Sequence, residues 1–271
     1  MIFGTLIFST FKEALEKKII LVIFIVIALI VFLMLAFLNL DSVVGMNDLL
    51  KMQGEEGYRQ GIIEFENVLI SQPTFLVVFS LLIVLSASFI PSMLEKGSVD
   101  VLLSKPISRV NIILGKYISV VLFAFLIIAF LISLIWLMIS IKSGIWHFPY
   151  LQSIIWFTFI FAVLYSLVLL TGVLTQSTVL SIIINLLLLF PVTGLLAARE
   201  ALMLGFLSSD VAKGIINFFY YIFPKPWDLR EMCVILISGG TIESWQPLIT
   251  SVLFMLAMLS ISIYYFSKKD Y

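Results

Sequence analysis

The chain contains long stretches in which no residue is charged at neutral pH. The longest covers residues 143–198, where His147 is the only residue that could carry a charge near neutral pH. A transmembrane helix needs about 20 apolar residues, because each residue adds 1.5 Å and the hydrocarbon core of a bilayer is roughly 30 Å thick. This stretch therefore predicts two spans. With 62% hydrophobic and 12% charged residues, the chain has more apolar surface than a soluble fold can bury.

The same reasoning predicts an all-α, polytopic membrane protein in which residues 1–271 form one transmembrane domain. It has six transmembrane helices, an N-terminal interfacial amphipathic helix and an outer re-entrant or interfacial helical segment. The predicted spans cover residues 19–40, 70–91, 118–140, 153–174, 179–197 and 245–266. Polar residues at 172–177, GVLTQS, predict a short turn between two antiparallel spans, and Pro191 predicts a kink in the fifth span.

Residues 1–18 are too short and too charged to cross a membrane. Apolar residues recur there at helical spacing, at Phe3, Leu6, Ile7, Phe11, Ala14 and Leu15. The charged residues Lys12, Glu13, Glu16 and Lys17 occupy the other side. This pattern predicts a helix that lies in the membrane surface. Residues 41–66 are polar and acidic, and we interpret them as an exposed loop with some helix around residues 46–52.

The segment 199–243 contains a short aromatic run, GIINFFYYIFP, at residues 214–224. We predict a re-entrant or interfacial helix here and name Phe218, Phe219, Tyr220 and Trp227 as candidates for an outer gate or a docking surface for an outer partner. Two alternatives remain open. The helix could simply anchor the loop, or residues 201–223 could form a seventh span. The seventh span would bury Asp210 and Lys213, each at about 2.5–3.5 kcal/mol at a helix centre.

The distribution of lysine and arginine predicts the orientation. Six spans place both termini and the loop after the second span on one face, where the short segments carry more basic residues than the opposite loops. By the positive-inside rule, this face is expected to be the cytoplasmic one. The protein is expected in the cytoplasmic (inner) cell membrane. Cys233, the single cysteine, is expected on the outer side or its interface, and His147 is expected at the surface or interface rather than as a metal ligand.

The loop after the second span is the most distinctive charged segment. Residues 95–116 read EKGSVDVLLSKPISRVNIILGK. A short amphipathic helix fits its first half, Pro106 would end that helix, and Ser108 is placed to cap the next one. From these residues alone, the segment is either a surface that receives force from a partner protein or an ordinary charged turn.

The motifs in this loop resemble the cytoplasmic signature of ABC-2-type transporter permeases, and the chain as a whole resembles the six-span copper-enzyme-maturation branch. The matching elements are Glu95 and Gly97, the pair 102–103, the run 106–109 and the pair 115–116. The resemblance implies that cytoplasmic ABC ATPase subunits, which bind ATP and Mg, dock on this loop. It also implies pairing with a second permease chain, most simply a homodimer, and export of a substrate. The implied docking interface comprises Glu95, Lys96, Gly97, Ser98, Val101, Leu102, Lys105, Pro106, Ser108 and Arg109.

The residues offer no case for an enzyme. No Gly-x4-Gly-Lys-Ser/Thr loop occurs, so we expect no ATP hydrolysis, no catalytic residue, no cofactor and no metal in this chain, and its zero net charge gives no nucleic-acid footprint. None of the predicted spans has an ionisable residue in its middle, as ion-coupled carriers usually do. An ATP-independent carrier or channel, and a scaffold that transmits force without moving cargo, remain alternatives.

Overall fold

The computed structural model describes residues 2–37, 54–70, 75–95, 97, 108–199 and 210–269, and in these residues every regular element is helical. The first group of helices is α1 (Ile2–Glu16), α2 (Ile19–Phe37), α4 (Gly54–Leu69), α5 (Phe75–Ser86) and α6 (Phe89–Met93). The second group is α8 (Arg109–Ser143), η2 (Phe148–Gln152), α9 (Ser153–Thr175), α10 (Thr178–Leu187), η3 (Leu188–Val192) and α11 (Thr193–Ala197). The last group is α13 (Asp210–Ile222), α14 (Pro226–Ile237) and α15 (Gln246–Lys268).

Four of these helical stretches are long and apolar enough to cross a membrane. They are Arg109–Ser143, Phe148–Thr175, Thr178–Ala197 and Gln246–Lys268. They correspond to the predicted third, fourth, fifth and sixth spans. The predicted first and second spans fall on the shorter apolar stretches Ile19–Leu29 and Val77–Met93. The structure is therefore a multi-helix membrane fold, while the number six stays a prediction.

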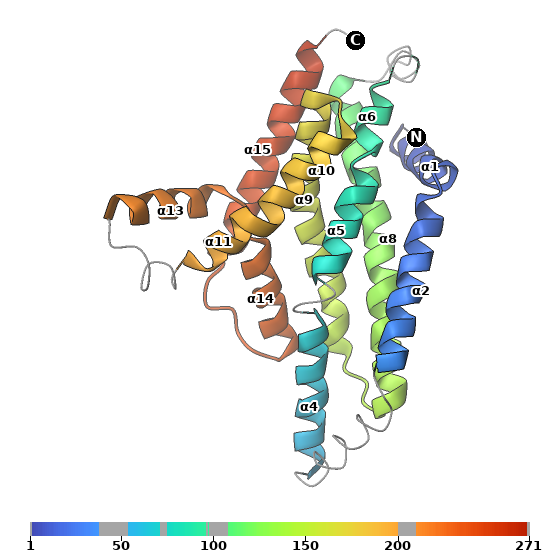
Figure 1. Cartoon of the computed structure of the whole chain (residues 1–271), viewed down its shortest axis with the longest axis vertical. Coiled ribbons are helices and arrows are strands. Elements are labelled where there is room, and N and C mark those ends of the chain that lie inside the picture. Colours follow the sequence, from blue (N-terminus) through green and yellow to red (C-terminus); the bar gives the residue numbers. More distant parts are fainter. Residues whose placement is uncertain are drawn as a thin grey trace.

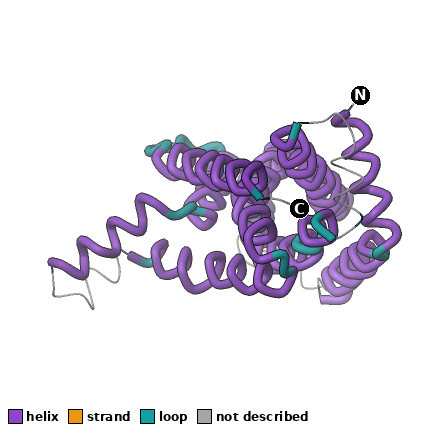
Figure 2. Tube along the Cα trace, turned by 90° about the horizontal axis from the view of Figure 1, so that it is seen from above, coloured by secondary structure: helices purple, strands orange, loops and turns teal. Residues whose placement is uncertain are grey.

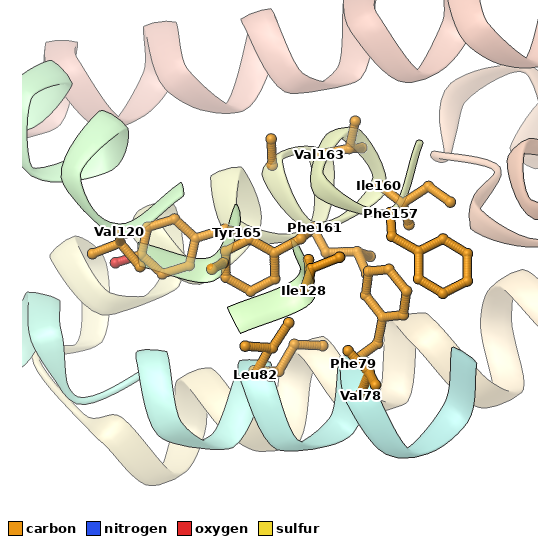
Figure 3. Packing of buried hydrophobic residues seen from close by; sticks show 14 of the residues in the cluster. Val78, Phe79, Leu82, Val120, Ile128, Phe157, Ile160, Phe161, Val163 and Tyr165 are labelled. Atoms are coloured by element: carbon orange, nitrogen blue, oxygen red, sulfur yellow. The ribbon is translucent and has the colours of Figure 1, made fainter. Parts of the chain in front are cut away.

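Helix α9 lies at the centre of the bundle, in contact with α5, α6, α8, α10, α14 and α15. It carries no charge and is apolar on all sides, which is typical of a helix surrounded by other helices. Aromatic rings of α9 pack against α5 and against one another, as Figure 3 shows. Phe157 meets Phe79 of α5 edge-on, and Phe161 stacks on Tyr165 of the same helix, each pair with ring centroids 5.5 Å apart.

The turn predicted at residues 172–177 is confirmed only for Gln176 and Ser177, because α9 continues through Thr175, and the kink predicted at Pro191 coincides with a change from α-helix to a π-helical turn. Helix α9 ends where Gln176 adopts a left-handed backbone with φ 53°, and the hydroxyl of Ser177 caps α10 by accepting from the Leu180 N–H at 3.4 Å. Helices α9 and α10 then pack against each other. Pro191 lies inside the π-helical turn η3, because proline lacks the N–H that a regular turn requires.

Both labelled chain ends, the end of α6 and the start of α8 lie at one end of the bundle (Figure 1). We call this the terminal end and the opposite one the distal end. Helix α8 begins at Arg109, so the last eight residues of the segment 95–116 form helix. The amphipathic helix predicted in its first half, and the helix predicted around residues 46–52, lie outside the described residues.

The prediction of an exposed loop at residues 41–66 is wrong for its described part, which forms most of α4. The apolar residues Tyr58, Ile62, Phe65 and Leu69 recur at helical spacing and give α4 one apolar face, which the acidic composition concealed. In the predicted outer segment, α13 ends before Pro224 and α14 starts at Pro226. The 13 residues of α13 are too few for a seventh span, and it projects sideways from the bundle beside α11 (Figures 1 and 2).

Candidate functional site

The candidate site is the terminal end of the bundle, where the loop between α6 and α8 leaves and re-enters the helices. Of the predicted docking interface, the structure describes Glu95, Gly97, Ser108 and Arg109; the other predicted residues, Lys96, Ser98, Val101, Leu102, Lys105 and Pro106, lie outside the described residues. Ser108 caps α8 as predicted: its hydroxyl oxygen accepts from the Asn111 N–H at 3.2 Å. Gly97 has φ +91°, a backbone conformation that glycine adopts without strain.

Arg109 contacts the end of α15 rather than projecting into open space. Its guanidinium donates hydrogen bonds to the carbonyl oxygens of Phe266 at 3.2 Å, Ser267 at 3.3 Å and Lys269 at 2.7 Å. The last carbonyls of a helix have no partner within the helix, so a cation there satisfies them and interacts favourably with the helix dipole. Arg109 thus joins the start of α8 to the end of α15, and its predicted role in docking stays a prediction.

Glu13 of α1 is the centre of a second group of contacts at this end. One carboxylate oxygen accepts from the Lys116 ammonium at 2.7 Å, and the other accepts from Lys17 at 2.8 Å and from the Ser92 hydroxyl. Lys116 is only 4% exposed. Glu13 was predicted on the solvent side of an interfacial helix, and this is wrong, because its carboxylate faces the buried ammonium of α8.

The electrostatics of this network favour the charged form of Glu13. Burial disfavours ionisation of Glu13, but the Lys116 charge and the hydrogen bonds from Lys116, Lys17 and Ser92 outweigh it and lower the pKa of the carboxyl. Both ammonium groups also face the ring of Phe89, with Lys116 at 5.2 Å and Lys17 at 5.9 Å from its centroid. The network is therefore an ionised cluster between α1, α6 and α8.

The network connects both stems of the loop. Ser92 and Phe89 lie on α6, which leads into the loop, and Lys116 lies on α8, which leads out of it. Sequence reasoning missed this arrangement because it placed Lys116 at the membrane boundary of a charged loop. The residue that pairs with it is 103 positions away, and no local pattern identifies such a partner.

Gly172 allows α9 to approach α6 closely just inside this network. A Cβ atom on Gly172 would lie 2.9 Å from Cγ2 and 3.0 Å from Cβ of Ile90, closer than real carbon atoms pack. Small residues at such points let membrane helices come together. The glycine therefore fixes the position of the stem helix α6 against the central helix.

We expect Gly172→Ala to lower the free energy of unfolding by roughly 1–3 kcal/mol, because the added methyl group must displace Ile90. Unfolding of the purified chain measures it. Gly214→Ala on α13 is the matched control, since no atom of the described residues lies within 4 Å of a Cβ there, and it should be neutral or slightly stabilising. Equal stability of the natural chain and Gly172→Ala would show that α6 can shift without cost.

A buried acid–histidine pair lies towards the distal end. His147 Nδ1 is 2.6 Å from Glu66 Oε2, and the two residues are 5% and 0% exposed. The prediction of a surface His147 is therefore wrong, while its place at a membrane interface stays a prediction, and Glu66 is not in an exposed loop. Within the described residues, Oε1 of Glu66 and the hydroxyl of Tyr150 are buried without a hydrogen-bond partner. Burial raises the pKa of Glu66, although the hydrogen bond and charge of His147 oppose the shift.

This pair predicts a pH-dependent effect of Glu66→Gln. A carboxyl whose pKa is raised by folding loses stabilisation as the pH rises through its ordinary and then its raised pKa. Glutamine does not ionise, so we expect the variant to gain about 2–4 °C in melting temperature over the natural chain at neutral pH and nothing in acid. Thermal unfolding across this pH range measures it, with the exposed Glu64→Gln as control. A variant that loses relative stability as the pH rises would contradict this sign.

The four outer-gate candidates do not share one surface. Phe218 and Phe219 are 62% and 44% exposed on α13, whereas Tyr220 is buried and donates a hydrogen bond to Asp228 at 2.8 Å. Trp227 donates to Thr193 Oγ1 at 3.0 Å and to the Leu189 carbonyl at 3.3 Å, which attaches α14 to the fifth predicted span. Successive helix residues point about 100° apart, so the run 218–220 could not present three rings to one side.

The remaining chemistry-bearing residues also lie inside the fold. Cys233 is fully buried in α14, so its thiol is not accessible, and its predicted place on the outer side or its interface stays a prediction. In the described residues, no three His, Cys, Asp or Glu side chains lie close enough together to hold a metal ion. The site that the geometry supports is therefore the terminal-end network, in which Glu13 contacts residues of both α6 and α8.

Comparison with known proteins agrees with this description. A family model described as "ABC-2 family transporter protein" matches residues 6–271, which is nearly the whole chain. No curated protein matches the chain, and no solved structure matches it either.

Proposed function

Because this chain belongs to the ABC-2 transporter family and is therefore a membrane permease of an ABC transporter, we propose that separate ATPase subunits drive it by docking on residues 95–109. The permease would pair with a second copy of itself, its terminal end would face the cytoplasm, and it would export its substrate. The matched family supports the ATPase as the source of energy, and the terminal-end network supports the loop as the place where force enters the bundle.

The observation that carries the proposal is the attachment of both loop stems to one network. A force on the loop acts on α6 and α8, and Glu13 contacts Ser92 of α6 and Lys116 of α8 at once. The helix α1 must then follow both stems. Because Gly172 of α9 lies against Ile90 of α6, a displacement of α6 would move α9. Because Arg109 of α8 donates to the end of α15, a displacement of α8 would move α15. Movement at the loop would therefore reach the helices of the bundle together.

Co-purification tests this function. We expect the chain, isolated in mild detergent from its own cells, to bring along a soluble P-loop ATPase whose hydrolysis it stimulates. Lys105→Glu in the loop should abolish both association and stimulation. Lys142→Glu is the matched control, because it makes the same charge change at the other end of α8, where the side chain is exposed. Loss of the ATPase in the Lys142 variant alone would place docking at the distal end and refute the proposal.

The orientation has a separate test. A cysteine at position 98, in a Cys233→Ser background, should react with an impermeant thiol reagent in inverted vesicles and stay unreacted in intact cells. Labelling in intact cells would reverse the orientation. Transport by the purified chain without any ATPase would instead favour an ATP-independent carrier.

A further inference from the structure

Two cations share one aromatic ring beside the projecting helix α13. The Arg199 guanidinium lies 3.5 Å from the ring centroid of Tyr220, and the Lys225 ammonium lies 3.8 Å from the same centroid. Lys225 is also 5.3 Å from the centroid of Tyr221. The carboxylate that contacts this tyrosine is that of Asp228, which accepts its hydroxyl hydrogen bond. The cluster of Arg199, Tyr220, Lys225 and Asp228 therefore carries an excess of positive charge.

Lys225 is the unusual member of this cluster. Its side chain is only 4% exposed, and its ammonium has no hydrogen-bond acceptor within the described chain. Burial lowers the pKa of Lys225 to about 8; the neighbouring Arg199 adds to the shift and Asp228 opposes it. A buried ammonium without an acceptor is costly, and an anionic oxygen at this position would satisfy it with a strong, charge-assisted hydrogen bond.

An apolar groove of about 440 Å³ lies next to this cluster, between η3, α11 and α13. Every residue that lines it is apolar, among them Val192, Leu195, Leu196, Ile216, Phe219 and Phe223. Residues of the groove and of the cluster are close together in the chain. Ile216 and Tyr220 are four residues apart on α13 and so lie on one face, and Arg199 follows Leu196 by three residues.

We propose that this groove and cluster bind an anionic glycerophospholipid of the surrounding bilayer, with its phosphate at the cations Arg199 and Lys225 and an acyl chain in the groove. Charge complementarity selects the phosphate, and the apolar lining selects the chain. Helix α13 also exposes Val211, Ile215 and Phe218, an apolar face typical of helices that lie in a membrane interface. The inference rests on the membrane location of the chain and not on ATPase docking.

Native mass spectrometry of the full-length chain, purified in detergent and titrated with defined lipids, tests the site. We expect phosphatidylglycerol to bind at least tenfold more tightly than phosphatidylcholine of the same acyl length. Lys225→Gln and the double variant Arg199→Gln/Lys225→Gln should remove this preference. Lys213→Gln, which removes one positive charge elsewhere on α13, should keep it. A specific site would be refuted if the natural chain bound phosphatidylglycerol no more tightly than phosphatidylcholine. It would also be refuted if Lys213→Gln lost this preference as fully as Lys225→Gln.

The groove needs its own variant, because the cations alone could bind a free anion. Ile216→Trp fills the groove and leaves every charge in place, so it should also weaken phosphatidylglycerol binding about tenfold. Soluble glycerol phosphate and inorganic phosphate should fail to displace the lipid. Full displacement by either, together with unchanged binding in Ile216→Trp, would make the site a soluble-anion site and overturn the lipid assignment. Circular dichroism shows whether each variant is folded. If the charge variants do not fold, the binding of phosphatidylglycerol to Ile216→Trp still tests the site.

Discussion

Replacement of Glu13 by alanine should lower the free energy of unfolding by about 3–5 kcal/mol, because it leaves the Lys116 ammonium buried without its counter-charge. Lys116 is 4% exposed and lies 2.7 Å from the carboxylate that would be lost. Unfolding of the purified chain in detergent or nanodiscs measures the effect. Glu16→Ala on the same helix is the control. Its pair with Lys12 is exposed and should contribute less than about 1 kcal/mol.

The double variant Glu13→Met/Lys116→Met separates the pair from the packing around it. Two apolar side chains leave no buried charge, so the double variant should recover most of the stability that Glu13→Ala loses. The natural chain should also lose this stabilisation in acid. The pKa of Glu13 is lowered by folding, so the contribution is present above the ordinary carboxyl pKa and disappears as the pH falls through the lowered one. Equal losses in Glu13→Ala and Glu16→Ala would rule out the network as a structural link.

Arg109→Glu should loosen the end of α15 and cost roughly 2–3 kcal/mol, the range for hydrogen bonds that involve a charged group. The substitution removes the donor to the carbonyls of Phe266, Ser267 and Lys269 and puts a negative charge beside the negative end of the helix dipole. Hydrogen exchange should increase in residues 262–269 and stay unchanged in the distal half of α15. If Arg109→Glu also reduces ATPase stimulation, this reduction should occur together with the increased hydrogen exchange at residues 262–269.

Arg109→Lys keeps the charge but is a shorter side chain, so its ammonium should reach fewer of the three carbonyls that Nη1 of Arg109 contacts. We expect it to show an intermediate rate of exchange in residues 262–269. If Arg109→Glu leaves exchange in α15 unchanged and still abolishes ATPase association, the side chain acts by docking, as the loop motif implies, and not by capping α15.

Much of the helical framework follows from the sequence because it depends on local composition. Charge-free stretches set the long spans at residues 118–140, 153–174, 179–197 and 245–266, since any charge in them would be expensive to bury. Local backbone chemistry likewise predicted the cap at Ser108 and the turn at residues 172–177, because a cap or a turn involves atoms only a few residues apart.

The buried ion pairs could not be predicted in this way. Glu13 lies 103 residues from Lys116, and Glu66 lies 81 residues from His147. Each residue alone looks like an ordinary surface charge, and only the packing of the helices shows that it has a partner in the interior. The same reason explains Trp227: an indole near a loop is typical of a membrane interface, yet its N–H donates to Thr193 inside the fold.

The length of α8 converts small rotations into large displacements. A helix of 35 residues is about 52 Å long, well beyond the roughly 30 Å of hydrocarbon that it must cross. As a stiff lever pivoting at Arg109, it would move its far end by about 0.9 Å for each degree of tilt, or about 4.5 Å for five degrees. The rings of Trp136, Trp146 and Phe148 are joined at that far end, with centroids 5.3 Å from Trp136 to each of the others. A slight swing at one membrane face would thus shift an aromatic cluster at the other by more than the thickness of a ring.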